Sequence, residues 1–127
     1  MRDPTYLPWG EVQWSEELYP GMYLVSTASH GGIMVDREAE LCLTSAVRKC
    51  GMRDGGYLCF EEDCCEQVVL RELLDRKMWK IPERLKDPEA FEKELNRIIR
   101  EYHPEYWAAR ERLRSRGRPQ RPSQIVR

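Results

Sequence analysis

The sequence predicts a single α+β domain, with a small and mainly antiparallel sheet packed with helices, a helical C-terminal extension and a basic tail. Its 127 residues fit one domain, because domains usually contain about 100 to 200 residues. Strand patterns separated by glycine turns fill the first part of the chain, and helical periodicity dominates the rest. We expect the domain to span residues 1–114, including a helical extension over about 83–114, and a flexible arginine-rich tail over 115–127.

The first third of the chain carries the strand signals. Alternating and apolar runs predict three short strands, over residues 11–15, 22–27 and 33–35. Pro20 and Gly21 suit the central positions of a type II turn between the first two strands. His30-Gly31-Gly32 is predicted to form a second tight turn, because glycine adopts positive φ without steric cost. The result would be a small antiparallel meander.

A helix is predicted next, with Asp36 as its N-cap and Gly51 at its end. Its apolar stripe would consist of Ala39, Cys42, Leu43, Ala46, Val47 and Cys50. After a loop signal over residues 53–56, a short strand over 57–60 is apolar on both faces and should be internal to the sheet.

Three further helices complete the expected fold. The first begins with the acidic run 61–63 and continues to about Trp79. The second starts at Asp87-Pro88 and has the clearest periodicity, carried by Phe91, Leu95, Ile98, Ile99 and Tyr102. The last opens at Pro104 and gives way to a segment too rich in Arg, Pro and Ser to bury much surface.

Composition excludes a membrane-spanning chain and reveals a charge asymmetry. Hydrophobic residues make up 41% and charged residues 34%, and no apolar run approaches the roughly 18 residues of a membrane span. The amino terminus lacks the pattern of a secretory signal, so we expect a cytoplasmic protein. Seven arginines and one glutamate follow residue 107 and give this segment a charge of +6. Because the net charge of the whole chain is −1, residues 1–107 carry a charge of −7.

The chain contains five cysteines, Cys42, Cys50, Cys59, Cys64 and Cys65. An odd number without an export signal predicts reduced thiols rather than a disulfide framework. Their spacing matches no zinc motif, so we expect no cofactor and no metal. The alternative is a structural zinc site built on Cys59, Cys64, Cys65 and His30, while Cys42 and Cys50 look like core residues.

The segment from Ser26 to Gly32 places three hydroxyl groups and one imidazole beside a double glycine. In the functional interpretation, His30 is a general base or metal ligand, with Ser26, Thr27 or Ser29 as nucleophile or hydrogen-bond donor and the glycine amides exposed to an anion. In the structural interpretation, the segment is a turn whose side chains satisfy backbone groups of the loop.

The acidic run 61–63 follows a strand directly, so its carboxylates could face His30 if the two strands are neighbours. We therefore predict that the strand ending at Phe60 lies beside the strand ending near Ser29, with His30 within about one water-mediated contact of an acid. The catalytic candidates are His30, Ser29, Glu62 and Asp63, and Glu61 joins them as a binding candidate. The structural alternative is that these acids complement a helix dipole, each contributing about 0.3 to 1 kcal/mol.

Arginines near the C-terminus are the other binding candidates, in particular Arg114, Arg116 and Arg118. They could contact phosphates, dock on an acidic partner or serve solubility alone. No aromatic residue follows Trp107, so the tail offers no stacking platform for single strands. The four tryptophans are expected to be core or interface anchors.

Several short motifs together resemble a family of small uncharacterised proteins of phages, plasmids and integrative elements. The motifs are Trp9-Gly10, Pro20-Gly21-Met22, the run from Val25 to Gly32, Gly55-Gly56, and the run from Glu61 to Cys64. The resemblance covers residues 8–75 and brings no established activity. It implies an accessory protein of a mobile element, a class that includes small inhibitors of host defence.

The expected function is therefore that of a non-enzymatic accessory protein of a mobile genetic element, which binds a host protein or nucleoprotein. Its narrower form is an anti-CRISPR or anti-restriction inhibitor, since an acidic body can occupy a basic nucleic-acid channel. One alternative is a hydrolase-like or metal-dependent enzyme centred on His30 and the acidic run 61–63. A second alternative is a DNA-associating regulator that uses the arginine tail.

Overall fold

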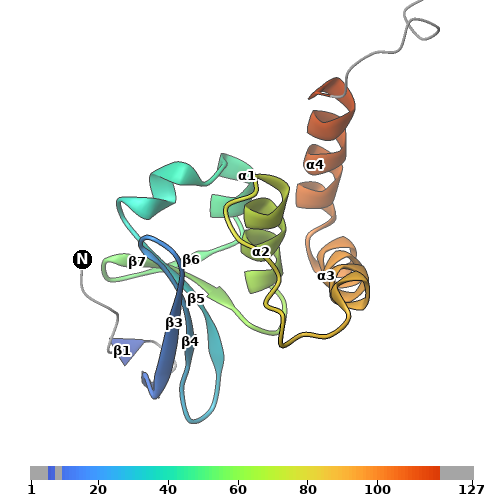
Figure 1. The fold of residues 1–127 in the computed structure, drawn as a ribbon. Helices are drawn as coiled ribbons and strands as arrows, with labels where there is room; N and C mark the ends of the chain where they lie inside the picture. The colour runs from blue at the N-terminus through green and yellow to red at the C-terminus, as the bar shows by residue number, and fades with distance from the viewer. Residues whose placement is uncertain (1–5, 8–9, 118–127) are drawn as a thin grey trace, which may run out of the picture.

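A five-stranded antiparallel sheet, flanked by helices, forms the centre of the computed structural model, which describes residues 6–7 and 10–117 (Figure 1). The strand order is β3-β4-β5-β7-β6, from β3 (Trp14–Tyr19), β4 (Met22–Ser26), β5 (Gly31–Asp36), β6 (Met52–Asp54) and β7 (Tyr57–Glu61). A separate two-stranded ribbon pairs β1 (Tyr6–Leu7) with β2 (Gly10–Glu11). The α+β class predicted from the sequence is confirmed.

The predicted meander is present as β3, β4 and β5. Pro20 and Gly21 connect β3 to β4, and Gly21 has the positive φ of +85° that a type II turn requires. The second turn differs from the prediction, because Gly31 and Gly32 do not form it. Both glycines lie inside β5, where they pair with Ser26 and Val25 of β4, and neither has positive φ.

Strands β6 and β7 form a hairpin through Gly55, whose φ is +60°. The sequence predicted β7 and its internal position correctly, since β7 pairs with β5 on one side and β6 on the other. The sequence did not predict β6, whose three residues are all exposed, and a loop was expected over residues 53–56 instead. An exposed three-residue edge strand carries no apolar alternation from which to detect it.

The single helix predicted after Asp36 is broken into a 3₁₀ turn, η1 (Ala39–Cys42), and a short helix, α1 (Ser45–Arg48). The predicted N-cap, Asp36, is instead the last residue of β5, and the N-cap of η1 is Glu38, which makes no side-chain capping bond. Asp36 still contacts the start of η1, because its Oδ1 accepts from the Ala39 amide at 2.7 Å. The break falls at Leu43 and Thr44, both extended, and Thr44 caps α1 by accepting from the Val47 amide. The apolar stripe therefore continues across two elements instead of one.

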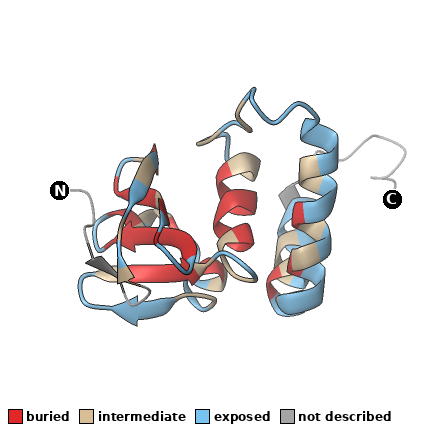
Figure 2. Ribbon diagram, turned by 90° about the horizontal axis from the view of Figure 1, so that it is seen from below, coloured by how far each residue is buried: buried red, intermediate tan, exposed pale blue. Residues whose placement is uncertain are grey.

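Each face of the sheet carries its own apolar cluster. Alternate residues such as Ile33 and Phe60 face the helices and join the main core, whereas the residues between them, Met34 and Cys59, belong to a smaller cluster on the other face. Buried residues are concentrated in the sheet and in α2 (Glu66–Asp75), while the helices beyond α2 are mostly exposed (Figure 2).

Two C-terminal helices form the predicted extension, α3 (Pro88–Tyr102) and α4 (Pro104–Gly117). Asp87 caps α3 by accepting from the Ala90 amide at 3.0 Å, and Pro88 occupies the first turn, as predicted. Leu95 and Ile99 of α3 are buried against the core. The fourth helix continues to Gly117, past the expected domain end at residue 114, and residues 118–127 lie outside the described part of the chain.

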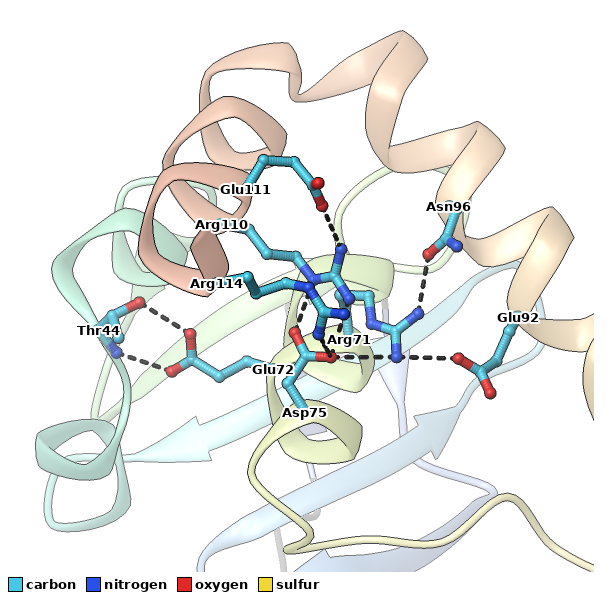
Figure 3. Close-up of polar contacts among 9 residues, drawn as sticks. All are labelled: Thr44, Arg71, Glu72, Asp75, Glu92, Asn96, Arg110, Glu111 and Arg114. Carbon is cyan, nitrogen blue, oxygen red and sulfur yellow. Dashed lines mark hydrogen bonds and ion pairs between the residues drawn. The ribbon is translucent and has the colours of Figure 1, made fainter. Parts of the chain in front are cut away.

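A polar network holds α3 and α4 against α2 (Figure 3). The buried Arg71 of α2 donates to Asn96 at 2.8 Å and pairs with Glu92 at 3.0 Å, both on α3, and with Asp75 at 3.1 Å. Asp75 in turn receives a bidentate contact from Arg110 of α4, at 2.6 and 3.0 Å. The first half of α4 is therefore anchored to the body.

A second buried carboxylate, Glu72, connects α2 to the start of α1. Its two oxygens accept from the backbone amide and the hydroxyl of Thr44, both at 2.9 Å (Figure 3). Glu72 also pairs with Arg76 at 3.2 Å. Arg76 donates further to the Cys42 carbonyl.

Within the described residues, no helix is long and apolar enough to cross a lipid bilayer.

Candidate functional site

The segment around His30 is a tight turn between β4 and β5, closed by Thr27. The Thr27 hydroxyl donates to the His30 carbonyl at 2.7 Å and accepts from the His30 amide at 3.1 Å and the Ser29 amide at 3.3 Å. Ser26, Ser29 and His30 are exposed, while Thr27 is buried. The contacts of Thr27 are those of a side chain that satisfies loop backbone groups.

Strand β5 separates the two strands that the sequence placed side by side. The strand ending at Phe60 pairs with β5 and β6, and the strand before Ser29 pairs with β3 and β5, so the prediction of direct adjacency is wrong. The reason is that β5 uses one edge to pair with β4 and the other to pair with β7. Among the described residues, no hydrogen bond or ion pair joins the His30 ring to a carboxylate.

Glu62 nevertheless approaches the same end of the sheet. Its backbone amide donates to the Gly31 carbonyl at 3.0 Å, and a Cβ on Gly31 would lie 3.0 Å from the Glu62 Oε2 atom. The same Cβ would lie 2.7 Å from the Val25 carbonyl oxygen, which is backbone and fixed in the sheet. Gly31 is therefore required for the close approach of β4 and the acidic loop.

Replacing Gly31 by alanine is expected to destabilise the protein by about 1 to 3 kcal/mol, because the added methyl group overpacks a backbone contact. Urea unfolding monitored by circular dichroism measures this free energy. Gly56→Ala is the matched control, since a Cβ there meets nothing within 4 Å. Equal stability of the Gly31 variant and this control would contradict the steric argument.

The first turn of α2, directly after the acidic loop, includes a carboxyl group that the sequence did not single out, Glu66. Burial, and then the charges of Glu62 and Asp63, raise its pKa to about 8. Its Oε1 atom is buried without a hydrogen-bond partner in the described part of the chain. Glu62 and Asp63 themselves are exposed and Glu61 is half-buried. The sequence placed these acids in the first turn of a helix, but Glu61 ends β7 and residues 62–65 form a turn, so this prediction is wrong. The helix itself, α2, begins only at Glu66 and ends at Asp75, before the expected end near Trp79.

Two thiols and one imidazole meet at the other side of this loop. Each of Cys64, Cys65 and His103 places one ligand atom within 4.8 Å of the other two, and all three side chains are half-buried. The two sulfur atoms are 2.8 Å apart, and the His103 Nε2 atom lies 2.9 Å from the Cys64 carbonyl oxygen. His103 is the residue between α3 and α4, so the cluster joins the start of α2 to the helical extension.

This cluster differs from the zinc alternative drawn from the sequence. Cys59 lies in the small apolar cluster on the opposite face of the sheet, where burial raises its pKa to about 11. Across residues 6–7 and 10–117, His30 belongs to no group of three metal-ligating side chains. The histidine that does meet the thiols, His103, is 38 positions from Cys65 and carries no spacing signal. Only the packing of α3 beside α2 brings them together.

Burial raises the pKa of three of the five thiols, those of Cys50, Cys59 and Cys65. All five cysteines are free, as the sequence predicted. Burial and a hydrogen bond with Cys64 raise the pKa of Cys65 to about 12, and burial raises that of Cys50. A thiol that remains protonated at neutral pH is a weak nucleophile, because the thiolate is the reactive form.

A pocket of about 730 Å³ opens between α1 and the junction of α3 with α4. Cys50 and His103 line it, together with three charged residues, Lys49, Glu105 and Arg112. None of the residues of the His30 segment or of the acidic run 61–63 contributes to its wall. The pocket and the cysteine cluster therefore share the α3–α4 junction.

The second half of α4 is the most exposed part of the helical extension. From Glu111 to Arg116 every residue is exposed, and Leu113 retains 58% of its accessible surface. Arg114 approaches Asp75 only at 3.9 Å, and neither Arg112 nor Arg116 has an ion-pair partner in the described residues. Of the predicted binding arginines, Arg114 and Arg116 thus lie on an exposed helix, and Arg118 lies outside the described residues.

The tryptophans take different positions from one another. Trp79 packs on Phe91 with 6.2 Å between ring centroids, and Trp107 lies under Arg100 and Arg110, whose guanidinium carbons are 5.3 and 4.7 Å from its ring centroid. Trp14 is 48% exposed, which excludes a core position and leaves that of an interface anchor. Trp9 lies outside the described residues.

Comparison with known proteins identifies a family and no function. The model of the family described as Domain of unknown function (DUF7007) matches residues 2–124, so the match includes the helical extension that the sequence motifs left out. No curated protein and no solved structure matches the chain.

Proposed function

The chain belongs to the DUF7007 family, whose description names no reaction, and we propose its function from its exposed surfaces. It is a non-enzymatic binding protein, and its basic helix α4 docks on an acidic surface of a partner protein. The observation that supports this proposal is the exposed second half of α4, where Arg112, Arg114 and Arg116 accompany Leu113. Arginine is enriched at protein interfaces, and neither Arg112 nor Arg116 has an ion-pair partner among the described residues.

The anchoring of α4 supports the same proposal. Arg110 is engaged with Asp75 and Glu111 and stacks over Trp107, so it fixes the helix rather than serving a partner. The arginines beyond it project from a helix that already has a defined direction. A binding surface on an ordered element loses less conformational entropy on association than a flexible tail does.

Charge separation favours an acidic protein over DNA as the partner. Residues 1–107 carry −7, and this charge repels a polyanion approaching the body. A protein surface can present its acidic groups to α4 alone, whereas a long duplex extends beyond the arginines and meets the acidic body. Screening over a Debye length of about 8 Å weakens this repulsion without removing it.

The test is a charge-reversed variant, Arg112→Glu with Arg116→Glu, in quantitative affinity capture from host lysate. Opposite charges at the interface steer association, so we expect an acidic partner to be enriched by the natural protein and to fall at least tenfold with the variant. The matched control reverses Arg37 and Lys86, which are exposed and lie outside α4. This control should retain the partner.

Gel shifts with duplex DNA at low and physiological salt complete the experiment. We expect no retention at physiological salt for any of the three proteins. Tight retention that disappears with the α4 variant would instead support the DNA-associating regulator. A set of captured proteins that is unchanged by the α4 variant would overturn the proposal.

A narrower form of the proposal is that the protein belongs to a mobile genetic element and inhibits a CRISPR or restriction component. The charge of −7 on residues 1–107 supports it, because an acidic body can occupy a basic nucleic-acid channel while α4 holds a neighbouring acidic surface. Competition with DNA for a purified effector complex tests this form. DNA binding by the effector that is unchanged by excess protein would contradict it.

A further inference from the structure

The strand-to-helix loop before α2 and the junction between α3 and α4 contribute metal-ligating side chains to one place. Cys64 and Cys65 come from the loop and His103 from the junction, and their ligand atoms lie within 4.8 Å of one another. All three are half-buried, so an ion can reach them from solvent while part of its hydration shell is replaced.

We infer that Cys64, Cys65 and His103 bind one zinc ion, which joins the helical extension to the body. Two thiolates and an imidazole form a donor set that suits a tetrahedral d¹⁰ ion, whereas Mg²⁺ and Ca²⁺ require oxygen ligands. This inference replaces the sequence-based expectation of a chain without metal, and it does not depend on the binding role of α4.

The orientation of His103 supports ligation. Its Nε2 atom lies 2.9 Å from the Cys64 carbonyl oxygen, and a carbonyl can only accept, so Nε2 carries the proton in the neutral ring. The lone pair is then on Nδ1, which is free to bind the ion. Histidines that bind metals commonly donate their other ring N–H to a backbone carbonyl or carboxylate in this way.

The sulfur atoms have to separate slightly when the ion binds. A zinc–sulfur distance of about 2.3 Å places two sulfurs of a tetrahedral site about 3.8 Å apart. The Cys64 and Cys65 sulfurs are 2.8 Å apart, so an opening of about 1 Å completes the geometry. Rotation about the side-chain bonds of two half-buried cysteines provides it.

Cys50 lies near this group without belonging to it. It lines the same pocket as His103, and its thiol donates to the Ala46 carbonyl at 3.5 Å. Among the described residues, the metal-ligating group consists of Cys64, Cys65 and His103, so the zinc ion takes its fourth ligand from solvent.

The experiment uses the full chain, reduced and stripped of metal with a chelator, and titrates it with Zn²⁺ and separately with Co²⁺. We expect one ion per chain by native mass spectrometry and a thiolate-to-cobalt charge-transfer absorption. At a zinc concentration about 100-fold above Kd, Tm should rise by about 10 °C. Absence of metal uptake by the reduced protein would overturn the inference. A disulfide between Cys64 and Cys65 that resists the reductant, and so prevents metal uptake, would overturn it as well.

Variants assign the ligands. Cys64→Ser, Cys65→Ser and His103→Gln should each weaken zinc binding at least 100-fold, and the glutamine keeps a donor for the Cys64 carbonyl. Cys42→Ser is the matched control, because Cys42 is also a half-buried free thiol but lies outside the cluster. Cys50→Ser should also retain zinc affinity, because Cys50 lies outside the group of three.

A measurement on the natural protein covers the case in which a variant does not fold. Zinc should protect Cys64 and Cys65 from alkylation at least tenfold, as read by peptide mass mapping, and should leave Cys42 unprotected. Equal alkylation of all three thiols with and without zinc would overturn the inference.

Discussion

Replacing Phe60 by alanine is expected to destabilise the protein by about 3 to 5 kcal/mol, the largest loss from any single core substitution considered for this chain. Phe60 is fully buried on the helix-facing side of β7, where its ring belongs to the main core. Removing the ring costs the transfer free energy of its atoms and leaves a cavity that a central strand cannot close. Urea unfolding measures the loss as a lower midpoint with an unchanged slope.

The space beside this ring provides a second check on the same prediction. A Cβ on Gly51 would lie 2.8 Å from the Phe60 Cζ atom and 2.9 Å from the Leu58 Cγ atom, so Gly51→Ala should cost about 1 to 3 kcal/mol in the natural protein. In a Phe60→Leu background this cost should fall, because the clashing ring atom is absent. A double-mutant cycle with no coupling between positions 51 and 60 would contradict the packing argument.

Replacing Arg71 by alanine is expected to cost about 3 kcal/mol. Arg71 is 5% exposed, and its guanidinium pairs with Asp75 and Glu92 and donates to Asn96 (Figure 3). Among the described residues, loss of this buried cation removes the polar contacts from α2 to Glu92 and Asn96 and one of the cations that Asp75 binds, which is more damaging than loss of an exposed pair. The expected result is a lower urea midpoint, together with earlier proteolysis of α3 and α4 than of the sheet.

Arg97→Ala is the control for this prediction. Arg97 also pairs with two carboxylates, Glu94 at 2.7 Å and Glu101 at 2.9 Å, but all three side chains are more than half exposed and lie on one helix. Exposed pairs within a helix contribute little, so stability should not change measurably. A loss at Arg97 as large as that at Arg71 would show that burial is not the deciding factor.

Elements whose signals are local were predicted well. The start of α3 follows from Asp87 and Pro88 alone, because a capping carboxylate and a proline in the first turn act on their own neighbours. The turn at Pro20 and Gly21 follows in the same way from the backbone freedom of glycine. The two faces of β7 were apolar in sequence, and β7 lies inside the sheet.

Elements that depend on distant partners were mispredicted. The helix expected after Asp36 is interrupted at Thr44, whose amide and hydroxyl bind Glu72, 28 residues further along the chain. The double glycine was expected to be a turn because glycine tolerates positive φ. Gly31 instead serves close packing against the Val25 carbonyl and Glu62, which only the sheet pairing decides.

The sequence by itself determined the α+β class, the acidic body, the arginines of the last helix and the reduced cysteines, because these follow from composition and short-range periodicity. Tertiary structure alone decided that His103 rather than His30 meets the thiols, and that Arg110 is anchored while Arg112 is exposed. The physical reason is that such contacts are set by how α3 and α4 pack beside α2. Pairing between residues 35 or more positions apart leaves no period in the sequence.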